Sequence, residues 1–285
     1  MQKIILFLVF AVTSIWSGTV MSEPVTTYIR YQTDGKVSYG ILEGETIHEL
    51  NGDIFGSHRR TGKKVPIEKV SILPPTDAQK VIAVGHNFQS HIEGMPTPKE
   101  PVLFAKLLTS LIGHDSEVRY FSDTTDLHFE GEMVLVIGKT ASNVSLENAS
   151  NYIFAVAPGN DISERHWQQN DVQWFRGKSS DTFGPVGPVM VRGADYNNLL
   201  VQTRVNGKVM QSQSTKDMIF SPEQIVSYVS RYVTLEPGDL IFSGTPGKTS
   251  AMLPGDVVEI ELEGVGVLRN TIGDKEEPQR LLKAK

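Results

Sequence analysis

Glu130 and Glu132 stand two residues apart at the start of an apolar stretch, residues 127–139 (LHFEGEMVLVIGK). In a β-strand, residues two apart point to the same face, so the two carboxylates would lie side by side. Both faces are apolar from Met133 onward, which predicts a strand buried on both sides. Two such carboxylates repel each other and lose hydration, so a divalent metal ion between them is favoured. The alternative is an exposed strand end where the acids pair with Arg or Lys.

A third carboxylate, Asp161, follows a second apolar strand predicted over residues 151–158. It stands three residues before Glu164, which is the spacing of a capping box for a helix through His166. The end of a buried strand can also hold a metal ligand rigidly, and a carboxylate has oxygens for both roles. The chain has no cysteine, so carboxylates and imidazoles are the available ligands. They favour Mg²⁺, Mn²⁺ or Ca²⁺ over a thiolate zinc site.

A polar segment follows the buried strand predicted over residues 80–84 and runs into a proline-rich loop. It contains His91 and Glu93, two side chains that can exchange protons. Such a segment is typical of a mobile lid, and the two residues are then candidate acid–base groups. The alternative is that each is an ordinary exposed loop residue.

Two cations, Arg176 and Lys178, stand in a polar segment over residues 175–182. Cations at such a spacing can bind a substrate carboxylate, or stabilise an oxyanion that develops near a metal ion. Arg176 is therefore a candidate substrate-binding residue and Lys178 a candidate catalytic residue. The alternative is a solvated turn in which both cations face water.

The composition excludes some classes of function. The 285 residues carry a net charge of −6 and no basic patch, so nucleic acid is not expected as a partner. The length allows one large core or two unequal domains. Gly247-Lys248-Thr249 imitates a phosphate-binding loop, but Phe242 stands where that motif has its first glycine. Pro254 then ends the segment before a helix can form, so nucleotide binding is excluded.

Three regions follow from the pattern along the chain. Residues 1–22 resemble a secretory signal peptide, with a basic start and an apolar run too short to span a membrane. They predict an exported protein, periplasmic or secreted, with no membrane span after cleavage; an uncleaved anchor is the alternative. The pattern over residues 23–75 predicts a small β domain with a turn at Asp34-Gly35. A linker signal follows, and residues 76–285 are predicted to form the catalytic domain. In the latter, Asn206-Gly207 predicts a hairpin and Ser221-Pro222 a helix start.

Six short motifs occur in one order along the chain, each weak alone and specific as a set. They are Gly85-His86-Asn87-Phe88-x-x-His91, Glu130-x-Glu132, Asn160-Asp161-Ile162-Ser163-x-Arg165, Arg176-x-Lys178-x-x-Asp181-Thr182, Gly184-Pro185-x-Gly187-Pro188 and Pro237-Gly238-Asp239-x-Ile241-x-x-Gly244-Thr245-Pro246. With this set, the chain from about residue 78 to residue 273 resembles the fumarylacetoacetate hydrolase family.

The resemblance implies an α+β, predominantly β fold of layered, rolled sheets with a few short helices. It also implies a homodimer and a Mg²⁺ or Mn²⁺ ion. The positions that match the family's metal ligands are Glu130, Glu132 and Asp161. These are the same three acids that the chemistry of the residues suggested.

The resemblance also implies roles for residues around the metal ion. Lys178 matches the active-site lysine, Thr245 and its neighbour Gly244 match the turn that holds the substrate carboxylate, and His91 matches a lid histidine that acts as general base with a water. Hydrolytic and decarboxylating members carry Glu three residues after that histidine, where this chain has Gly94. Glu93 comes one residue earlier, which on a helical turn rotates the side chain by about 100°.

Members of the family act on 2-oxo acids and acylpyruvates, so the resemblance implies a divalent-metal-dependent enzyme for such a substrate. Hydrolytic C–C cleavage through a metal-stabilised enolate is the expected reaction. An isomerase, decarboxylase or lyase on a related 2-oxo or enol acid is one alternative. A non-catalytic, exported metal- or oxo-acid-binding relative with an altered lid is the other.

Overall fold

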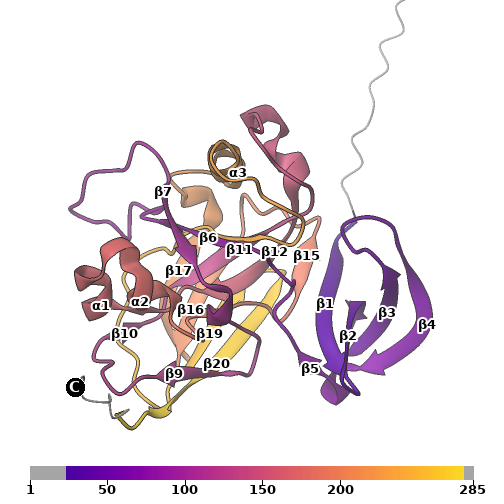
Figure 1. The fold of residues 1–285 in the computed structure, drawn as a ribbon, viewed down its shortest axis with the longest axis horizontal. Coiled ribbons are helices and arrows are strands. Elements are labelled where there is room, and N and C mark those ends of the chain that lie inside the picture. Colours follow the sequence, from indigo (N-terminus) through magenta and orange to yellow (C-terminus); the bar gives the residue numbers. More distant parts are fainter. Residues whose placement is uncertain (1–23, 279–285) are drawn as a thin grey trace, which may run out of the picture.

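β-Strands are the main regular element of the protein. The computed structural model describes residues 24–278, where strands far outnumber helices, and the predicted α+β, predominantly β fold is confirmed (Figure 1). The strands are β1 (Thr26–Thr33), β2 (Lys36–Glu43), β3 (Thr46–Gly52), β4 (His58–Pro66), β5 (Ser71–Ile72), β6 (Val81–Gly85), β7 (Val102–Lys106), β8 (Leu111–Ile112), β9 (Glu117–Tyr120), β10 (Leu127–His128), β11 (Gly131–Ile137), β12 (Ile153–Asn160), β13 (Ser163–Glu164), β14 (Gly184–Pro185), β15 (Met190–Arg192), β16 (Leu200–Val205), β17 (Lys208–Ser214), β18 (Leu240–Phe242), β19 (Val257–Leu262) and β20 (Gly266–Lys275). The α-helices are α1 (Arg165–Asn170), α2 (Phe175–Ser179) and α3 (Pro222–Ser230), and the 3₁₀ turns are η1 (Ile67–Lys69), η2 (Leu108–Ser110), η3 (Leu146–Tyr152), η4 (Val172–Trp174) and η5 (Thr215–Asp217).

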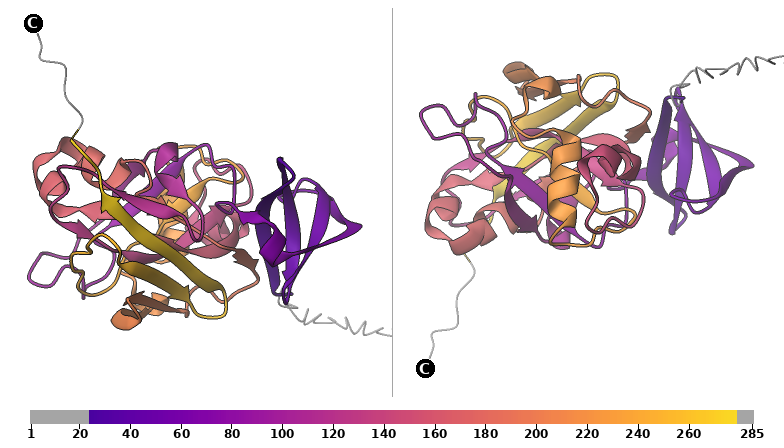
Figure 2. Two further views of the ribbon diagram at one scale, coloured as in Figure 1. Left: turned by 90° about the horizontal axis from the view of Figure 1, so that it is seen from below. Right: turned by 90° about the horizontal axis from the view of Figure 1, so that it is seen from above.

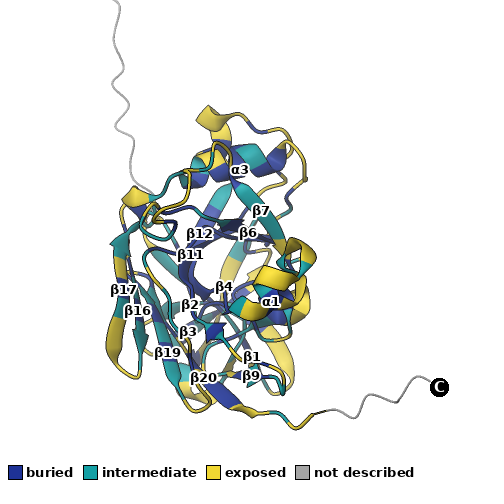
Figure 3. Cartoon of the chain, turned by 90° about the vertical axis from the view of Figure 1, so that its left-hand side faces the viewer, coloured by how far each residue is buried: buried dark blue, intermediate teal, exposed yellow. Residues whose placement is uncertain are grey.

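Two large sheets contain most of the strands. The larger one has the order β4-β3-β2-β1-β15-β12-β11-β18-β6-β7, and β5 pairs with β1. The smaller one has the order β17-β16-β19-β20-β9. In the larger sheet β11 and β12 lie near the middle, where the ribbon is buried (Figure 3).

The N-terminal strands β1–β4 lie at one end of the molecule, as all three views of the ribbon show (Figures 1 and 2). The predicted turn at Asp34-Gly35 is confirmed: both residues have positive φ, and β1 and β2 pair on either side of it. Strand β1 also pairs with β15, with Tyr28 opposite Met190, so this region extends the larger sheet. The domain boundary near residue 75 stays a prediction.

Strand β11 is buried over its whole length, between β12 on one side and β18 on the other, which confirms the prediction from its apolar faces. Met133 and Leu135 belong to one cluster of buried residues, which includes Ile260 of β19 in the smaller sheet. Val134 and Val136 belong to a second cluster on the other face. Each such side chain contributes about 1.5–3 kcal/mol when fully buried. The strand therefore gives the acids at its N-terminal end a rigid support.

Helix α3 begins where its sequence predicts, whereas α1 begins later than the predicted capping box at Asp161. Ser221 caps α3 in a full capping box with Gln224, and Pro222 occupies its first turn, as predicted. The N-cap of α1 is Glu164, whose side chain accepts a hydrogen bond from the Trp167 N–H at 2.6 Å. Asp161 therefore does not cap this helix, and its carboxylate is available to the site. No helix within residues 24–278 is long and apolar enough to cross a membrane. The predicted signal peptide, residues 1–22, lies outside the described residues.

Candidate functional site

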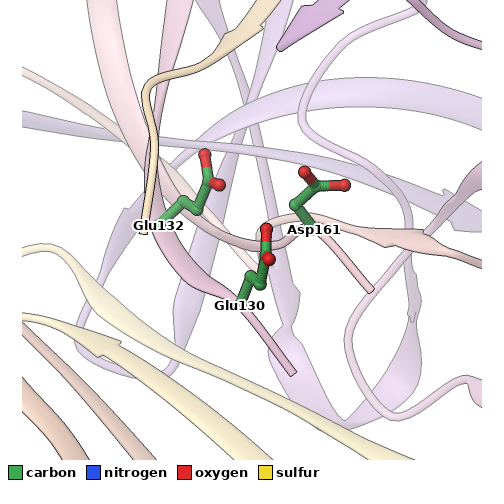
Figure 4. A group of neighbouring side chains, drawn as sticks. All are labelled: Glu130, Glu132 and Asp161. Carbon is green, nitrogen blue, oxygen red and sulfur yellow. The ribbon is translucent and has the colours of Figure 1, made fainter. Parts of the chain in front are cut away.

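Glu130, Glu132 and Asp161 form one buried carboxylate cluster. Each offers a carboxylate oxygen, and these oxygens all lie within 4.8 Å of one another. Figure 4 shows the three side chains pointing toward a common centre, two from the start of β11 and one from the end of β12. The side chains are 4%, 1% and 1% exposed, so water does not screen their charges effectively. The structure thus brings Asp161 together with the two glutamates, and their role as metal ligands stays a prediction.

Two glycines allow the backbone to present these carboxylates. A Cβ on Gly131, between the two glutamates, would lie 2.0 Å from the Thr203 hydroxyl of β16, so only glycine lets β11 approach the smaller sheet this closely. Gly244 has φ +105, where an L side chain is strained, and its N–H donates to Glu132 Oε2 at 2.7 Å. The predicted residue Gly244 thus contacts the cluster through its backbone. Thr245 follows it and lines the same cavity.

Two buried lysines supply positive charge to the cluster. Lys178 Nζ lies 2.5 Å from Glu130 Oε2 and 2.8 Å from Asp161 Oδ2. Lys106 Nζ lies 2.6 Å from Asp161 Oδ1 and also donates to the Lys178 backbone carbonyl. The two ammonium groups therefore hold Asp161 from both of its oxygens. Within residues 24–278, Glu132 makes no ion pair with Lys or Arg.

The charges in the cluster shift its pKa values in opposite directions. Burial would raise the pKa of Glu130, but the Lys178 and Arg165 charges hold it well below its usual range. Burial raises the pKa of Glu132 well above the usual value, and the charges of Asp161 and Glu130 add to that. Burial opposes the charged form of Lys178, yet its two carboxylate partners outweigh burial and raise its pKa. The cluster is therefore short of positive charge at Glu132.

A cavity of about 330 Å³ opens over the cluster. Its wall includes His91 and Arg165, together with Lys178 and Thr245. Arg165 Nη2 lies 2.6 Å from Glu130 Oε1, and His91 Nε2 lies 3.8 Å from the same oxygen. The His91 Nδ1 is 2.7 Å from the Gly247 carbonyl oxygen, which can only accept. Nδ1 therefore carries a proton, and in the neutral ring Nε2 is the free base on the cavity side.

Arg165 is held by a chain of hydrogen bonds that reaches the surface. Its Nη2 donates to Thr249 Oγ1 at 2.8 Å. Thr249 Oγ1 lies 2.8 Å from His128 Nδ1, and His128 Nε2 lies 2.9 Å from the Asp126 carboxylate. Burial lowers the pKa of His128 despite that carboxylate. In the neutral ring, His128 Nε2 donates to Asp126 and Nδ1 accepts from the Thr249 hydroxyl. That hydroxyl in turn accepts from Arg165, so every donor in the chain meets an acceptor.

Two of the predicted site residues lie away from the cavity. Glu93 and Lys248 form an exposed ion pair at 3.3 Å, with side chains that are 75% and 84% exposed. Arg176 is also exposed and pairs with Asp171 at 2.7 Å. Arg176 and Lys178 are two residues apart on α2, so they point to different sides of the helix, and only Lys178 reaches the cluster. The predictions that Glu93 and Arg176 act in the site are not supported by this geometry.

Two residues that complete the site were not predicted as site residues. Lys106 ends a strand-like segment, and nothing in its local sequence distinguishes it from a lysine that enters solvent. The sequence did contain an indication for Arg165, because this residue is the last one of the motif Asn160-Asp161-Ile162-Ser163-x-Arg165. Its place as the first residue of α1 directs it back over Glu130.

The carboxylate cluster fits a divalent metal ion. All three candidate ligands are oxygen donors, which suits Mg²⁺ and Mn²⁺. In the structure described here, Lys178 Nζ lies between two of the carboxylates and occupies part of the space where such charge is needed. The deficit of positive charge at Glu132 is a second reason to expect a cation, since burial keeps three carboxylates from ionising together.

Comparisons with protein families match residues 80–273 to the C-terminal domain of fumarylacetoacetate hydrolase, and residues 27–75 to a family described as Rv2993c-like, N-terminal. An uncharacterised protein of Archaeoglobus fulgidus is 44% identical to this chain. The match covers 85% of this chain and 94% of the length of the Archaeoglobus fulgidus protein. The mitochondrial oxaloacetate tautomerase fahd2 of Xenopus laevis is 34% identical to this chain. The match covers 71% of this chain and 68% of the length of the Xenopus laevis protein.

Solved structures show the same fold. The 2-hydroxyhepta-2,4-diene-1,7-dioate isomerase of Mycobacterium marinum has a TM-score of 0.83 and 37% identity, covering 88% of this chain and all of its own. The fumarylpyruvate hydrolase of Pseudomonas aeruginosa, in complex with Mn²⁺ and pyruvate, has a TM-score of 0.65 and 28% identity, covering 72% of this chain and 92% of its own.

The comparisons correct one prediction. An exported protein was expected from residues 1–22, but relatives that share the catalytic region are named as mitochondrial enzymes, among them those of Xenopus laevis and Bos taurus. The prediction of export is therefore wrong. The remaining comparisons agree with the family that the six motifs indicated and with the fold. With a family match over residues 80–273, the chain belongs to the fumarylacetoacetate hydrolase family.

Proposed function

We propose that the protein is a divalent-metal-dependent isomerase that interconverts the keto and enol forms of a small 2-oxo dicarboxylic acid. One observation carries this choice over hydrolysis. Of the predicted acid–base pair, His91 lines the cavity, whereas Glu93 is 75% exposed and paired with Lys248. Tautomerisation needs one group that takes a proton from carbon and returns it to oxygen, which a single imidazole can do. The names of the Xenopus laevis and Mycobacterium marinum relatives support an isomerase.

The residues of this chain have separate tasks in that reaction. A divalent ion held by Glu130, Glu132 and Asp161 would supply a Lewis acid that polarises the 2-oxo group. Lys178, next to two of these carboxylates, holds a positive charge where negative charge develops on the substrate oxygen. His91 Nε2 faces the cavity as the base that removes the proton from C3.

Two further groups orient the substrate. Arg165 keeps a positive charge in the cavity wall and binds a substrate carboxylate. The Thr245 hydroxyl accepts from Gln211 Nε2 at 2.9 Å and donates to the Gly131 carbonyl at 2.9 Å, which fixes the turn after Gly244 against β11. A cavity of about 330 Å³ is at the lower end of ligand-site volumes, so a short substrate is favoured.

Hydrolytic C–C cleavage is the second candidate, and the fumarylpyruvate hydrolase of similar fold favours it. Hydrolysis needs a water that is positioned and deprotonated at a second carbonyl. Here the partner of His91 Nδ1 is the neutral Gly247 carbonyl, which strengthens the base less than a carboxylate would. We therefore expect hydrolysis to be slower than tautomerisation.

A direct comparison of the two reactions tests the proposal. With Mg²⁺ or Mn²⁺ present, the decay of enol-oxaloacetate is followed by ultraviolet absorbance, and cleavage of an acylpyruvate is followed on the same protein. We expect faster, metal-dependent enol decay and little cleavage. His91→Asn should lower the rate of enol decay by about 10²-fold or more. Glu93→Gln should leave it unchanged. Efficient acylpyruvate cleavage that Glu93→Gln abolishes would instead establish the hydrolase.

Thr249 allows a milder test of how Arg165 is oriented. Thr249→Val keeps the shape but removes the hydroxyl between Arg165 and His128. We expect KM for the 2-oxo acid to rise while kcat changes little, and stability to fall by about 0.5–1.5 kcal/mol, because the partly buried Arg165 and His128 each lose a hydrogen-bond partner. Steady-state kinetics and thermal melts measure both effects. Thr249→Ser should restore KM, and an unchanged KM in Thr249→Val would show that the Thr249 hydroxyl does not orient Arg165 for substrate binding.

A further inference from the structure

A second cavity lies beside the one that contains the carboxylate cluster. It has a volume of about 460 Å³ and is lined mainly by apolar groups of β7 and of the segment between α1 and α2. Its wall consists of Val102, Leu103, Phe104, Ala105, Gln173, Trp174 and Phe175. Trp174 also lines the cavity over the carboxylates, so one indole belongs to the walls of both.

Trp174 lies between residues of the two cavities. Its ring centroid is 5.8 Å from that of His86, which lines the carboxylate cavity, and 5.2 Å from that of Phe104, which lines the apolar one. A Cβ on Gly85 would lie 3.0 Å from the indole, so the ring packs directly on the end of β6. The Phe104 ring centroid is itself 5.3 Å from Lys178 Nζ. The apolar cavity therefore begins about one side chain away from the candidate catalytic lysine.

The backbone holds the indole in this place. Gln173 and Trp174 have φ of 59° and 57°, so two consecutive residues other than glycine are left-handed. Such a conformation is disfavoured for residues with a Cβ and persists where surrounding contacts maintain it. On either side, Val172 and Phe175 are 84% and 57% exposed, whereas Trp174 turns inward.

We propose that Trp174 determines the length of substrate that the site accepts. The indole closes the polar cavity against the apolar one, so the protein takes short 2-oxo acids, and loss of the indole joins the cavities and admits 2-oxo acids with an apolar tail. This inference rests on the proposed function for the identity of the ligand class. Substitution of Trp174 changes the cavity wall and leaves His91 and Lys178 in place. We therefore expect it to change which substrate lengths bind and not the acid–base groups.

The test compares the wild-type protein with Trp174→Ala, and uses Trp174→Phe as a control that keeps an aromatic wall. With Mn²⁺ present, isothermal titration calorimetry measures the binding of 2-oxobutanoate, 2-oxohexanoate and 2-oxooctanoate. In the wild type and in Trp174→Phe, affinity should fall as the tail lengthens. In Trp174→Ala it should rise by about three- to four-fold for each added methylene group that is buried. Trp174→Leu is used in the same series if the alanine variant does not fold.

Each outcome separates this inference from the proposed function. If oxaloacetate is tautomerised but Trp174→Ala has the same tail dependence as the wild type, the inference is overturned and the proposed function stands. If the tail dependence reverses as expected while no oxaloacetate is converted, the inference stands and the proposed function fails. If neither protein binds any member of the series with Mn²⁺ present, the inference is overturned, and the oxaloacetate assay alone decides the proposed function.

Discussion

Asp161→Asn is expected to remove the metal-dependent activity and to weaken Mn²⁺ binding by more than about 100-fold. That is a larger loss than the one expected when a residue that only hydrogen-bonds a metal ligand is removed. Asp161 is one of three carboxylates whose oxygens lie within 4.8 Å of one another. An amide keeps the size of the side chain but carries no charge, and a hard divalent ion binds it more weakly than it binds a carboxylate. Isothermal titration calorimetry with Mn²⁺ measures the affinity, and the tautomerase assay measures the activity.

The same substitution at a surface aspartate provides the control. Asp115 pairs with Arg269 at 2.7 Å, and both side chains are about half exposed. Asp115→Asn should leave metal binding and activity unchanged and cost at most about 1 kcal/mol. Asp161→Asn also removes the ion-pair partner of Lys106 and leaves Lys178 with Glu130 alone, so circular dichroism must accompany its titration. A folded Asp161→Asn protein with wild-type Mn²⁺ affinity would contradict the assignment of this ligand.

Lys178→Met is expected to separate metal binding from catalysis. Lys178 Nζ lies between Glu130 and Asp161, so without a bound cation its removal leaves two buried carboxylates facing each other. Breaking a buried ion pair in this way costs about 3–5 kcal/mol, so the metal-free variant should melt at a much lower temperature. Added Mn²⁺ should raise the melting temperature of the variant more than that of the wild type, because the ion replaces the lost charge.

The metal-loaded Lys178→Met protein should still be a poor enzyme. A charge placed where an oxyanion develops contributes about 10²–10³-fold to the rate, so kcat should fall by that factor. Lys80 offers a matched control, since its ammonium group pairs with the buried Asp239 at 2.9 Å far along the chain from the carboxylate cluster. Lys80→Met should lower stability without this response to Mn²⁺. A Lys178→Met protein with normal kcat would remove Lys178 from the mechanism.

Local patterns predicted the parts of the site that regular strands position. The alternation after Met133 predicted that β11 is buried on both faces, and a period of two placed Glu130 and Glu132 on one side. Asp161 follows the next strand in the chain, which pairs with β11, so the structure brings Gly131 opposite Asn160. Neighbouring antiparallel strands thus carry the three acids to one place without any long-range information.

The rest of the site depends on contacts that local sequence does not contain. Lys106 reaches Asp161 from β7, which is separated from β12 by β11, β18 and β6 in the sheet order. Glu93 stands in an irregular segment where no period applies, and Arg176 lies on α2, in a stretch where the sequence indicated only a polar segment. The same holds for Thr249, whose loop resembled a phosphate-binding motif yet holds Arg165 through its hydroxyl. Local sequence therefore placed the three acids together, but it did not indicate which distant side chains, such as Lys106, reach them.

The central claim is that the buried carboxylates bind a divalent ion on which a 2-oxo acid is then positioned. Crystals soaked with Mn²⁺ and oxalate, measured near the manganese absorption edge, test it most directly. We predict one strong anomalous peak in coordination contact with oxygens of Glu130, Glu132 and Asp161, oxalate beside it, and His91 Nε2 facing that ligand. No peak at this position, with Lys178 Nζ still bonded to Glu130 and Asp161, would contradict the account.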